Sequence, residues 1–151
     1  MTLVVIVLAG CGEDAERAPG AAQPTKSTKA DPRATPDPVE LEIRQAANAY
    51  MKAFGRRDWK GVCATLVPSE RRYFDRLAGA CERPFRQGWR GMTKGARRLV
   101  ANSIAGEIRI GPYQAVIDIT ENGDPGPYMK LYAIEENGRW GIARSKKQRE
   151  S

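Results

Sequence analysis

The sequence predicts an α+β domain in which N-terminal helices pack on an antiparallel sheet. Three observations carry this prediction. From residue 38 to about residue 92, apolar residues recur every three or four positions, as they do on one face of a helix. From residue 98 onward they alternate with polar residues, as they do in half-buried strands. Turn residues separate these segments, so the helices come first and a meander of strands follows.

Four helices are expected. The first begins at Asp37, a good N-cap residue, with Pro38 at the first helical position, and Gly55 ends it. Ser69 is expected to cap the third helix, directly after the proline that stops the second. The expected helices cover residues 38–54, 59–66, 69–77 and 81–91.

Four strands are expected after the helices. The first is long and is expected to bend or bulge around Ala105-Gly106, because glycine inside a strand is typical of such irregularities. Asn137-Gly138 predicts a tight hairpin before the last strand, since both residues adopt positive φ angles. The expected strands cover residues 98–110, 113–120, 128–135 and 139–144, and a frayed basic tail is expected over residues 146–151.

The N-terminus resembles a bacterial lipoprotein signal. An apolar run over residues 3–8 ends in the box Leu8-Ala9-Gly10-Cys11, and it is far shorter than the roughly 20 residues that a membrane-spanning helix needs. The resemblance implies that Cys11 becomes the lipid-bearing first residue of the mature protein. The competing interpretation is the remnant of a signal that is not lipidated. No Lys or Arg precedes Leu3, so we expect the signal to begin further upstream.

This interpretation divides the chain into four parts. Residues 1–10 are the signal segment, and residues 11–37 are a disordered linker anchored through lipid. The linker contains several prolines and no large apolar residue, so it cannot bury enough apolar surface to order itself. Residues 38–145 form the domain, and residues 146–151 form the tail. The expected location is the cell envelope of a bacterium, where two or more acyl chains hold a protein on a membrane.

Composition excludes several kinds of chemistry. The chain has no histidine, which removes Ser-His and Cys-His nucleophile pairs and histidine metal sites. The formal net charge is +7, and the excess of basic residues lies after residue 38. A positive field favours anionic partners of many kinds but indicates nothing about the fold.

The cysteines predict one disulfide bond. If Cys11 carries lipid, Cys63 and Cys81 are the two that remain, and export to an oxidising compartment favours a bridge between them. Such a bridge stabilises by about 3 kcal/mol on the chain-entropy argument. The alternative is two separate buried thiols. Two thiols alone do not make a structural zinc site, so we expect no metal and no cofactor.

The order of elements resembles the nuclear transport factor 2-like superfamily, which includes ketosteroid isomerase, scytalone dehydratase and SnoaL-type polyketide cyclases. The resemblance covers residues 39–144. One departure is that the short hairpin usual between the helices and the main sheet is not found here. The matching pieces are Ala46-Ala47-Asn48-Ala49-Tyr50, Asp58-Trp59, the pair Cys63 and Cys81, and Asn137-Gly138-Arg139-Trp140.

The resemblance implies a sheet that curls around the first helix into a cone with an apolar pocket, and a homodimer formed through the sheet. Enzymes of this superfamily use Asp, His or Tyr inside the cone. Candidate pocket residues are the aromatic ones that the helices and strands bring inward. These are Tyr50, Phe54, Trp59, Phe85, Trp89, Tyr132 and Trp140.

Asp118 is the candidate catalytic residue. A buried carboxylate at this position could act as a base if desolvation raised its pKa. Strand alternation favours the other interpretation, in which Asp118 faces water while Ile117 and Ile119 face inward. No second carboxylate stands where it would complete an acid–base pair.

A basic stripe on the fourth expected helix is a candidate contact for an anionic surface. Its alternative is a solvated helix face in an arginine-rich protein. Anionic lipid headgroups or an acidic envelope polymer suit it better than nucleic acid, because the protein is expected to be exported. The stripe consists of Arg83, Arg86, Arg90 and Lys94.

Together these features predict a membrane-tethered exported domain that binds a small apolar ligand or an envelope partner without catalysis. The alternative is a SnoaL-like isomerase or dehydratase that uses Asp118 and a pocket tyrosine. A third interpretation is a structural protein whose cone is filled by its own side chains.

Overall fold

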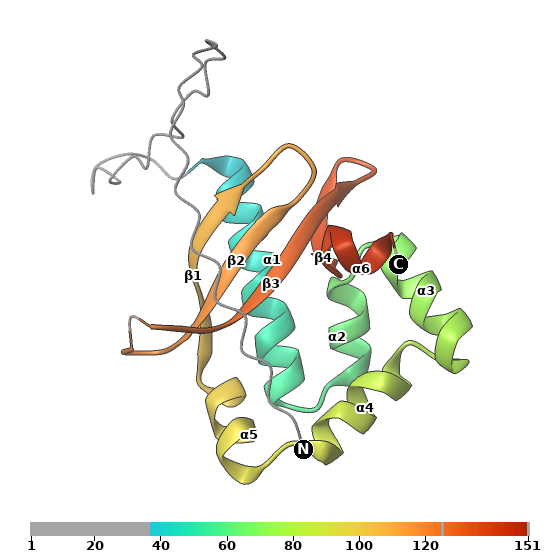
Figure 1. Cartoon of the computed structure of the whole chain (residues 1–151), viewed down its shortest axis with the longest axis vertical. Helices are drawn as coiled ribbons and strands as arrows, with labels where there is room; N and C mark the ends of the chain where they lie inside the picture. The colour runs from blue at the N-terminus through green and yellow to red at the C-terminus, as the bar shows by residue number, and fades with distance from the viewer. Residues whose placement is uncertain (1–36, 125, 151) are drawn as a thin grey trace, which may run out of the picture. The chain divides into compact units, whose positions relative to one another are not determined.

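The structure, a computed structural model, describes residues 37–124 and 126–150 (Figure 1). The expected signal, the lipidation site Cys11 and all but the last residue of the expected linker lie outside the described residues. The helices before the sheet are α1 (Pro38–Gly55), α2 (Trp59–Thr65), α3 (Pro68–Ala78), α4 (Glu82–Gly91) and α5 (Lys94–Ala101). The later elements are β1 (Ser103–Ile110), β2 (Ala115–Glu121), β3 (Pro127–Glu136), β4 (Arg139–Ala143) and α6 (Lys146–Arg149).

The four strands form one antiparallel sheet in the order β1-β2-β3-β4, with helices packed against it, which confirms the α+β prediction. A register shift between Ala105 and Ile108 interrupts the β1–β2 pairing where a bend was expected. Asn137 and Gly138 both have positive φ, at 57° and 74°, and they close the hairpin between β3 and β4. The turn residues therefore do what their backbone preferences predict.

The core lies between α1 and the sheet. Asp37 caps α1 as expected, because its carboxylate accepts the Val39 N–H at 2.8 Å. The buried face of α1 carries Ile43, Ala47 and Met51. Against it pack the inward residues of the strands, which are Ala105, Ala115, Ile117, Ile119, Leu131, Ala133 and Ile142.

Polar side chains of α1 reach both edge strands of the sheet. On β1, the Asn48 Oδ1 accepts the Ala105 N–H at 2.8 Å, and the Arg44 guanidinium donates to the carbonyls of Ala105 and Gly106. On β4, the Glu42 Oε1 accepts the Trp140 N–H at 3.0 Å. The helix is thus tied to the first and the last strand by side chains as well as by apolar packing.

The predicted disulfide is present. Cys63 of α2 is bonded to Cys81, the residue that precedes α4, with their Cα atoms 6.1 Å apart. Both cysteines are buried in the core cluster. The bridge therefore fastens α4 to α2, and α2 in turn packs on α1.

One expected strand begins later than predicted. Residues 94–101, whose last four were expected to open the first strand, form α5, and β1 starts at Ser103. The Thr93 hydroxyl accepts the Ala96 N–H at 3.2 Å and so provides the N-cap of the helix. Val100 is buried as a residue of this helix and not as an inward-facing residue of a strand. The segment therefore forms the helix that Thr93 caps and not the strand that the alternating apolar pattern predicted.

Two further expectations at helix ends are wrong. α3 begins at Pro68 and not after Ser69, because proline suits the first helical turn, where its missing N–H is not needed. The residues after β4 are not frayed throughout. Ser145 and Gln148 form a capping box that starts α6, and the Lys146 N–H donates to the Gln114 Oε1 at 2.8 Å.

Candidate functional site

Two clefts adjoin Leu66 and Val67, the two residues that connect α2 to α3, which we call the connecting segment. The segment runs beside β4, where the Val67 N–H donates to the Ile142 carbonyl at 3.2 Å. Its close approach needs a glycine on β4, since a Cβ on Gly141 would stand 2.8 Å from the Val67 Cγ1. Leu66 lines both clefts, so the segment forms a wall that they share.

The first cleft, which we call the Tyr50 cleft, has a volume of about 240 Å³. Tyr50 of α1, Phe74 of α3 and Phe85 of α4 provide its aromatic lining. On the sheet side it is lined by residues 130–132 of β3 and by Ile142 and Ala143 of β4, around the pair of Tyr132 with Ala143, which is the last residue pair of the two strands. The cleft therefore lies where helices meet the end of the β3–β4 pairing.

Tyr50 is the most distinctive polar group of this cleft. Burial raises the pKa of its phenol to about 12, so the hydroxyl stays protonated at any physiological pH. None of the other described residues accepts a hydrogen bond from it or donates one to it. The Tyr50 side chain is half-buried, and its hydroxyl keeps some contact with solvent, so it is a hydrogen-bonding group that a ligand in the cleft can reach.

The aromatic residues predicted for the pocket fall into three groups. Tyr50, Phe85 and Tyr132 line the Tyr50 cleft, although the register of β3 places Tyr132 on the same sheet face as Val116, away from α1. Phe54, Trp59 and Trp89 do not line it and pack edge to face on one another, with the Phe54 ring centre 5.7 Å from those of both tryptophans. Trp140 lines the second cleft.

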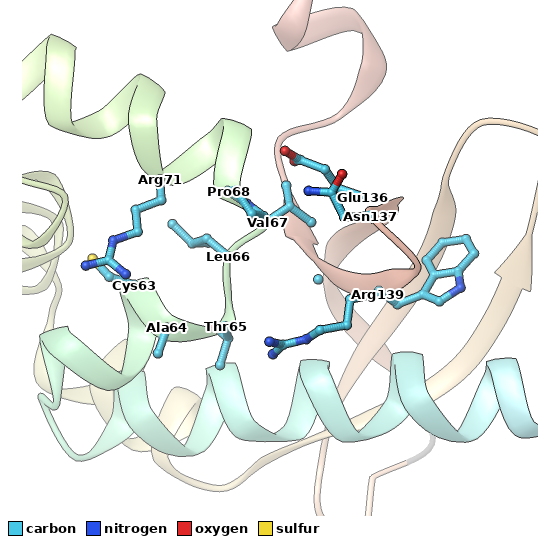
Figure 2. A pocket seen from close by; sticks show the side chains of 12 residues that line it. Cys63, Ala64, Thr65, Leu66, Val67, Pro68, Arg71, Glu136, Asn137 and Arg139 are labelled. Carbon is cyan, nitrogen blue, oxygen red and sulfur yellow. The ribbon is translucent and has the colours of Figure 1, made fainter.

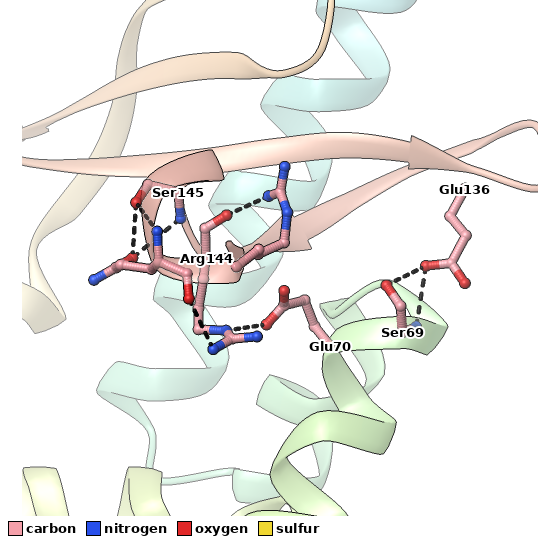
Figure 3. A network of polar contacts seen from close by, with 7 residues as sticks. Ser69, Glu70, Glu136, Arg144 and Ser145 are labelled. Atoms are coloured by element: carbon pink, nitrogen blue, oxygen red, sulfur yellow. Dashed lines mark hydrogen bonds and ion pairs between the residues drawn. The ribbon is translucent and has the colours of Figure 1, made fainter. Parts of the chain in front are cut away.

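A buried ion pair stands at the edge of the Tyr50 cleft (Figure 3). Glu70 of α3 is only 2% exposed, and its Oε2 accepts from the Arg144 Nε at 2.9 Å. The Arg144 guanidinium also lies 3.3 Å from the centre of the Tyr73 ring. The pair joins the first turn of α3 to the chain leaving β4, and it holds two charges at the cleft in fixed positions.

Ser69, beside Glu70, makes a second connection to the sheet (Figure 3). The Glu136 Oε2 accepts from the Ser69 hydroxyl at 2.6 Å and from its backbone N–H at 3.0 Å. These two hydrogen bonds hold the pKa of the Glu136 carboxyl below its usual range. Glu136 thus takes the place of a local N-cap, because Val67 has no side chain able to cap α3.

The second cleft, which we call the guanidinium cleft, is larger, with a volume of about 390 Å³. It lies between the connecting segment and the β3–β4 hairpin (Figure 2). Arg71 of α3 and Arg139 of β4 both line it, and so does Trp140, the last of the predicted pocket residues. Leu66 and Val67 provide a buried apolar wall.

Asp118 does not face water as strand alternation predicted. It is 7% exposed, and both of its carboxylate oxygens accept from the Arg109 guanidinium, at 2.9 and 3.0 Å. This hydrogen-bonded pairing holds the pKa of Asp118 below its usual range. Arg109 pairs with Val116 across β1 and β2, so the ion pair lies on the sheet face opposite Ile117. Asp118 lines neither cleft.

The basic stripe keeps most of its charges on the surface. Arg86 is paired with Glu82, one turn away, at 3.3 Å. Arg83, Arg90 and Lys94 are exposed and make no ion pair with any described residue. Lys94 belongs to α5 and not to the helix that carries the three arginines.

Sequence reasoning missed the charged residues that line the two clefts, which are Glu70, Arg71, Lys130, Glu136, Arg139 and Arg144. Nothing local marks them, because Glu70 meets Arg144 across 74 residues of chain. Within the described residues, no group of three or more Cys, Asp or Glu side chains is arranged to hold a metal ion. Nor does any helix in residues 37–124 and 126–150 combine the length and the apolar character that crossing a membrane requires.

Comparison of the chain with protein-family models, curated proteins and solved structures finds no match.

Proposed function

We propose that the protein is an exported lipoprotein of a bacterial envelope whose nuclear transport factor 2-like domain binds a small, largely apolar ligand in the Tyr50 cleft without catalysis. The observation that carries the proposal is the Tyr50 hydroxyl, which belongs to a half-buried side chain lining the cleft and has no hydrogen-bonding partner among the described residues. A ligand with one acceptor atom and an apolar body would satisfy the hydroxyl and cover Phe74 and Phe85.

Two features support export and anchoring. The box Leu8-Ala9-Gly10-Cys11 has the composition of a lipoprotein signal. The Cys63–Cys81 bridge is typical of oxidising compartments. Labelling of cells with an alkyne analogue of palmitate tests the anchor. Label is expected on the wild-type protein and not on Cys11→Ser, whereas equal labelling of the two would refute the lipidation of Cys11.

The contacts of α1 support a cone-like arrangement. Glu42 on one side of the helix and Asn48 on the other hydrogen-bond to β4 and β1, the two edge strands. Contacts of one helix with both edges of a sheet are consistent with a sheet that curls toward that helix. The superfamily resemblance implies this geometry, with a ligand pocket at the open end of the curl.

The geometry of Asp118 favours binding over the alternative isomerase or dehydratase function. A general base needs a pKa near the working pH and access to substrate. The Asp118 pKa is lowered and not raised, and Arg109 occupies both of its oxygens. We therefore assign Asp118 a structural role as the partner of Arg109 across the β1–β2 pair.

A fluorescence titration tests ligand binding. Prodan is an uncharged naphthalene fluorophore with a ketone acceptor, and its emission shifts to the blue in apolar surroundings. We expect saturable binding that Tyr50→Phe weakens about tenfold, since one hydrogen bond to a half-buried donor is worth about 1 kcal/mol or more. Phe85→Ala should weaken binding further.

The matched control is Tyr113→Phe, which removes the same hydroxyl from an exposed ring outside the Tyr50 cleft. It should bind prodan like the wild type. Unsaturable binding, or equal affinity of the Tyr50→Phe and wild-type proteins, would contradict the assignment of the ligand to this cleft.

A further inference from the structure

The guanidinium cleft is the larger of the two, and the proposed function leaves it unused. We propose that it binds a small anion that carries an aromatic or apolar body, such as an aromatic carboxylate or phosphate ester. The anionic group would lie between Arg71 and Arg139, and the body would lie on the connecting segment and Trp140. This site is separate from the Tyr50 cleft, with which it shares only Leu66.

Two guanidinium groups border the same hollow. Arg71 comes from α3 and Arg139 from the start of β4, and Figure 2 shows their side chains on either side of Leu66, with that of Arg71 turned toward Cys63. Neither side chain hydrogen-bonds or forms an ion pair with any residue of the described ranges 37–124 and 126–150. Guanidinium forks bind carboxylate and phosphate oxygens in a bidentate manner, so two unpaired forks at one cleft favour an anionic ligand.

The carboxylates near the cleft are already engaged. Glu136 also lines it, but its Oε2 accepts two hydrogen bonds from Ser69 and its Oε1 lies 3.5 Å from Arg72. Asp75, which shares a neighbouring hollow with Arg71, accepts the Cys81 N–H at 2.8 Å. The charges of Arg71 and Arg139 are therefore not neutralised within the described part of the chain.

The remaining lining favours an organic anion over a bare inorganic one. Trp140 contributes a half-buried indole, and the nearly fully buried Leu66 and Val67 form the apolar wall of the cleft. Inorganic phosphate would contact the arginines and leave the exposed part of the indole in water. A ligand with a ring or short apolar chain could also cover that part of Trp140 and gain from its removal from water.

Titrations followed by NMR on the full-length, disulfide-bonded chain test the proposal. The readouts are the Trp140 indole N–H signal, assigned with Trp140→Phe, and the backbone N–H signals of Leu66 and Val67. Phenyl phosphate and phenylacetate represent the two kinds of anion, and whichever binds more tightly identifies the anionic group. Phenylethanol lacks the charge and inorganic phosphate lacks the apolar body, so both should bind at least about tenfold more weakly.

Charge removal locates the site. Arg71→Gln and Arg139→Gln should each weaken binding of the preferred anion about tenfold or more, because each loses a charge-assisted hydrogen bond. The matched control is Arg83→Gln, which removes an exposed, unpaired arginine from α4, outside the cleft, and should change affinity less than about twofold. Tyr50→Phe should leave anion binding unchanged, which separates this proposal from the function proposed above.

Three results would overturn the proposal. The first is the absence of saturable shifts with both aromatic anions. The second is an equal loss of affinity in Arg83→Gln, which would assign the effect to the overall positive field. The third is inorganic phosphate binding as tightly as phenyl phosphate, which would remove the role of the apolar wall.

Discussion

The Tyr50 cleft and the guanidinium cleft share a wall but differ in how their polar groups are used. At the Tyr50 cleft the charges of Glu70 and Arg144 satisfy each other, and the groups without a hydrogen-bonding partner among the described residues include the neutral Tyr50 hydroxyl and the exposed Lys130 ammonium. At the guanidinium cleft the carboxylate of Glu136 is satisfied locally, and two arginines are left without partners. The pairing of charges, more than their number, therefore decides which ligand chemistry each cleft favours.

The largest effect is expected from removal of the disulfide bond between Cys63 and Cys81. Replacement of Cys63 and Cys81 by serine should lower the free energy of unfolding by about 3 kcal/mol, because the bridge closes a loop between residues 18 apart in sequence. Urea unfolding with and without a reductant measures the loss. The wild-type midpoint should fall in reductant while that of the double variant stays constant. A wild-type midpoint unaffected by the reductant would contradict this prediction.

The next largest effect is expected from a substitution at Gly141, which faces the connecting segment that forms the wall between the two clefts. Gly141→Ala should destabilise by about 2 kcal/mol, because the new Cβ would stand 2.8 Å from the Val67 Cγ1 and 3.1 Å from the Val67 nitrogen. Both clefts should lose affinity for their probes, since the connecting segment has to move. Urea unfolding and the two titrations measure this.

The matched control for that substitution is Gly88→Ala. Gly88 lies inside α4, and a Cβ there would meet nothing within 4 Å. Alanine is the better helix former, so this variant should gain up to about 1 kcal/mol and keep both affinities. A similar loss in both variants would show that crowding at Val67 is not the cause.

A third effect should separate the clefts. Glu70→Gln keeps an oxygen that can accept from Arg144 but removes its charge, and it should cost about 1.5 kcal/mol because the Arg144 charge loses its counterion in a nearly buried place. Prodan binding should weaken, whereas anion binding at Arg71 and Arg139 should hold. Loss of both affinities together would contradict the separation of the clefts.

The smallest expected effect is a loss of folding stability at acidic pH. The folded-state pKa of Glu136 lies below its usual value, so its contribution to stability is complete above about pH 4.5 and is lost as the pH falls through the lowered pKa. Urea unfolding at a series of acidic pH values should show this loss. Ser69→Ala removes the strongest contact and should reduce the loss by roughly 0.5–1 kcal/mol. An unchanged pH dependence in Ser69→Ala would contradict the assignment.

The elements with local signals were predictable from the sequence. α1 has a cap, a proline and a glycine at its ends as well as a regular apolar stripe, and the structure agrees closely. The Asn137-Gly138 hairpin and the Cys63–Cys81 bridge were equally accessible, since turn chemistry and cysteine count do not depend on distant residues. α5 was missed although Thr93 and Ala96 carry a cap signal, because its short apolar pattern fits either period.

The clefts were much less predictable, because they depend on residues far apart in sequence. The burial of Asp118 follows from Arg109, which a bulge in β1 brings across the strand pair. From the sequence, Glu70 is expected to be an exposed residue of a first helical turn. Its partner Arg144 lies near the far end of the chain, so no local pattern indicates the ion pair. Arg71 and Arg139 line the same cleft only because the connecting segment brings α3 beside the β3–β4 hairpin.

The hydrogen bonds from α1 to the edge strands have a consequence for the behaviour of the protein at high concentration. Exposed strand edges are templates on which other chains can add and aggregate. On β1, side chains of α1 already occupy the N–H of Ala105 and the carbonyls of Ala105 and Gly106, and on β4 Glu42 occupies the N–H of Trp140. Another chain can extend the sheet at these positions only by displacing part of the central helix, so the same contacts that hold the core together guard the domain against polymerisation.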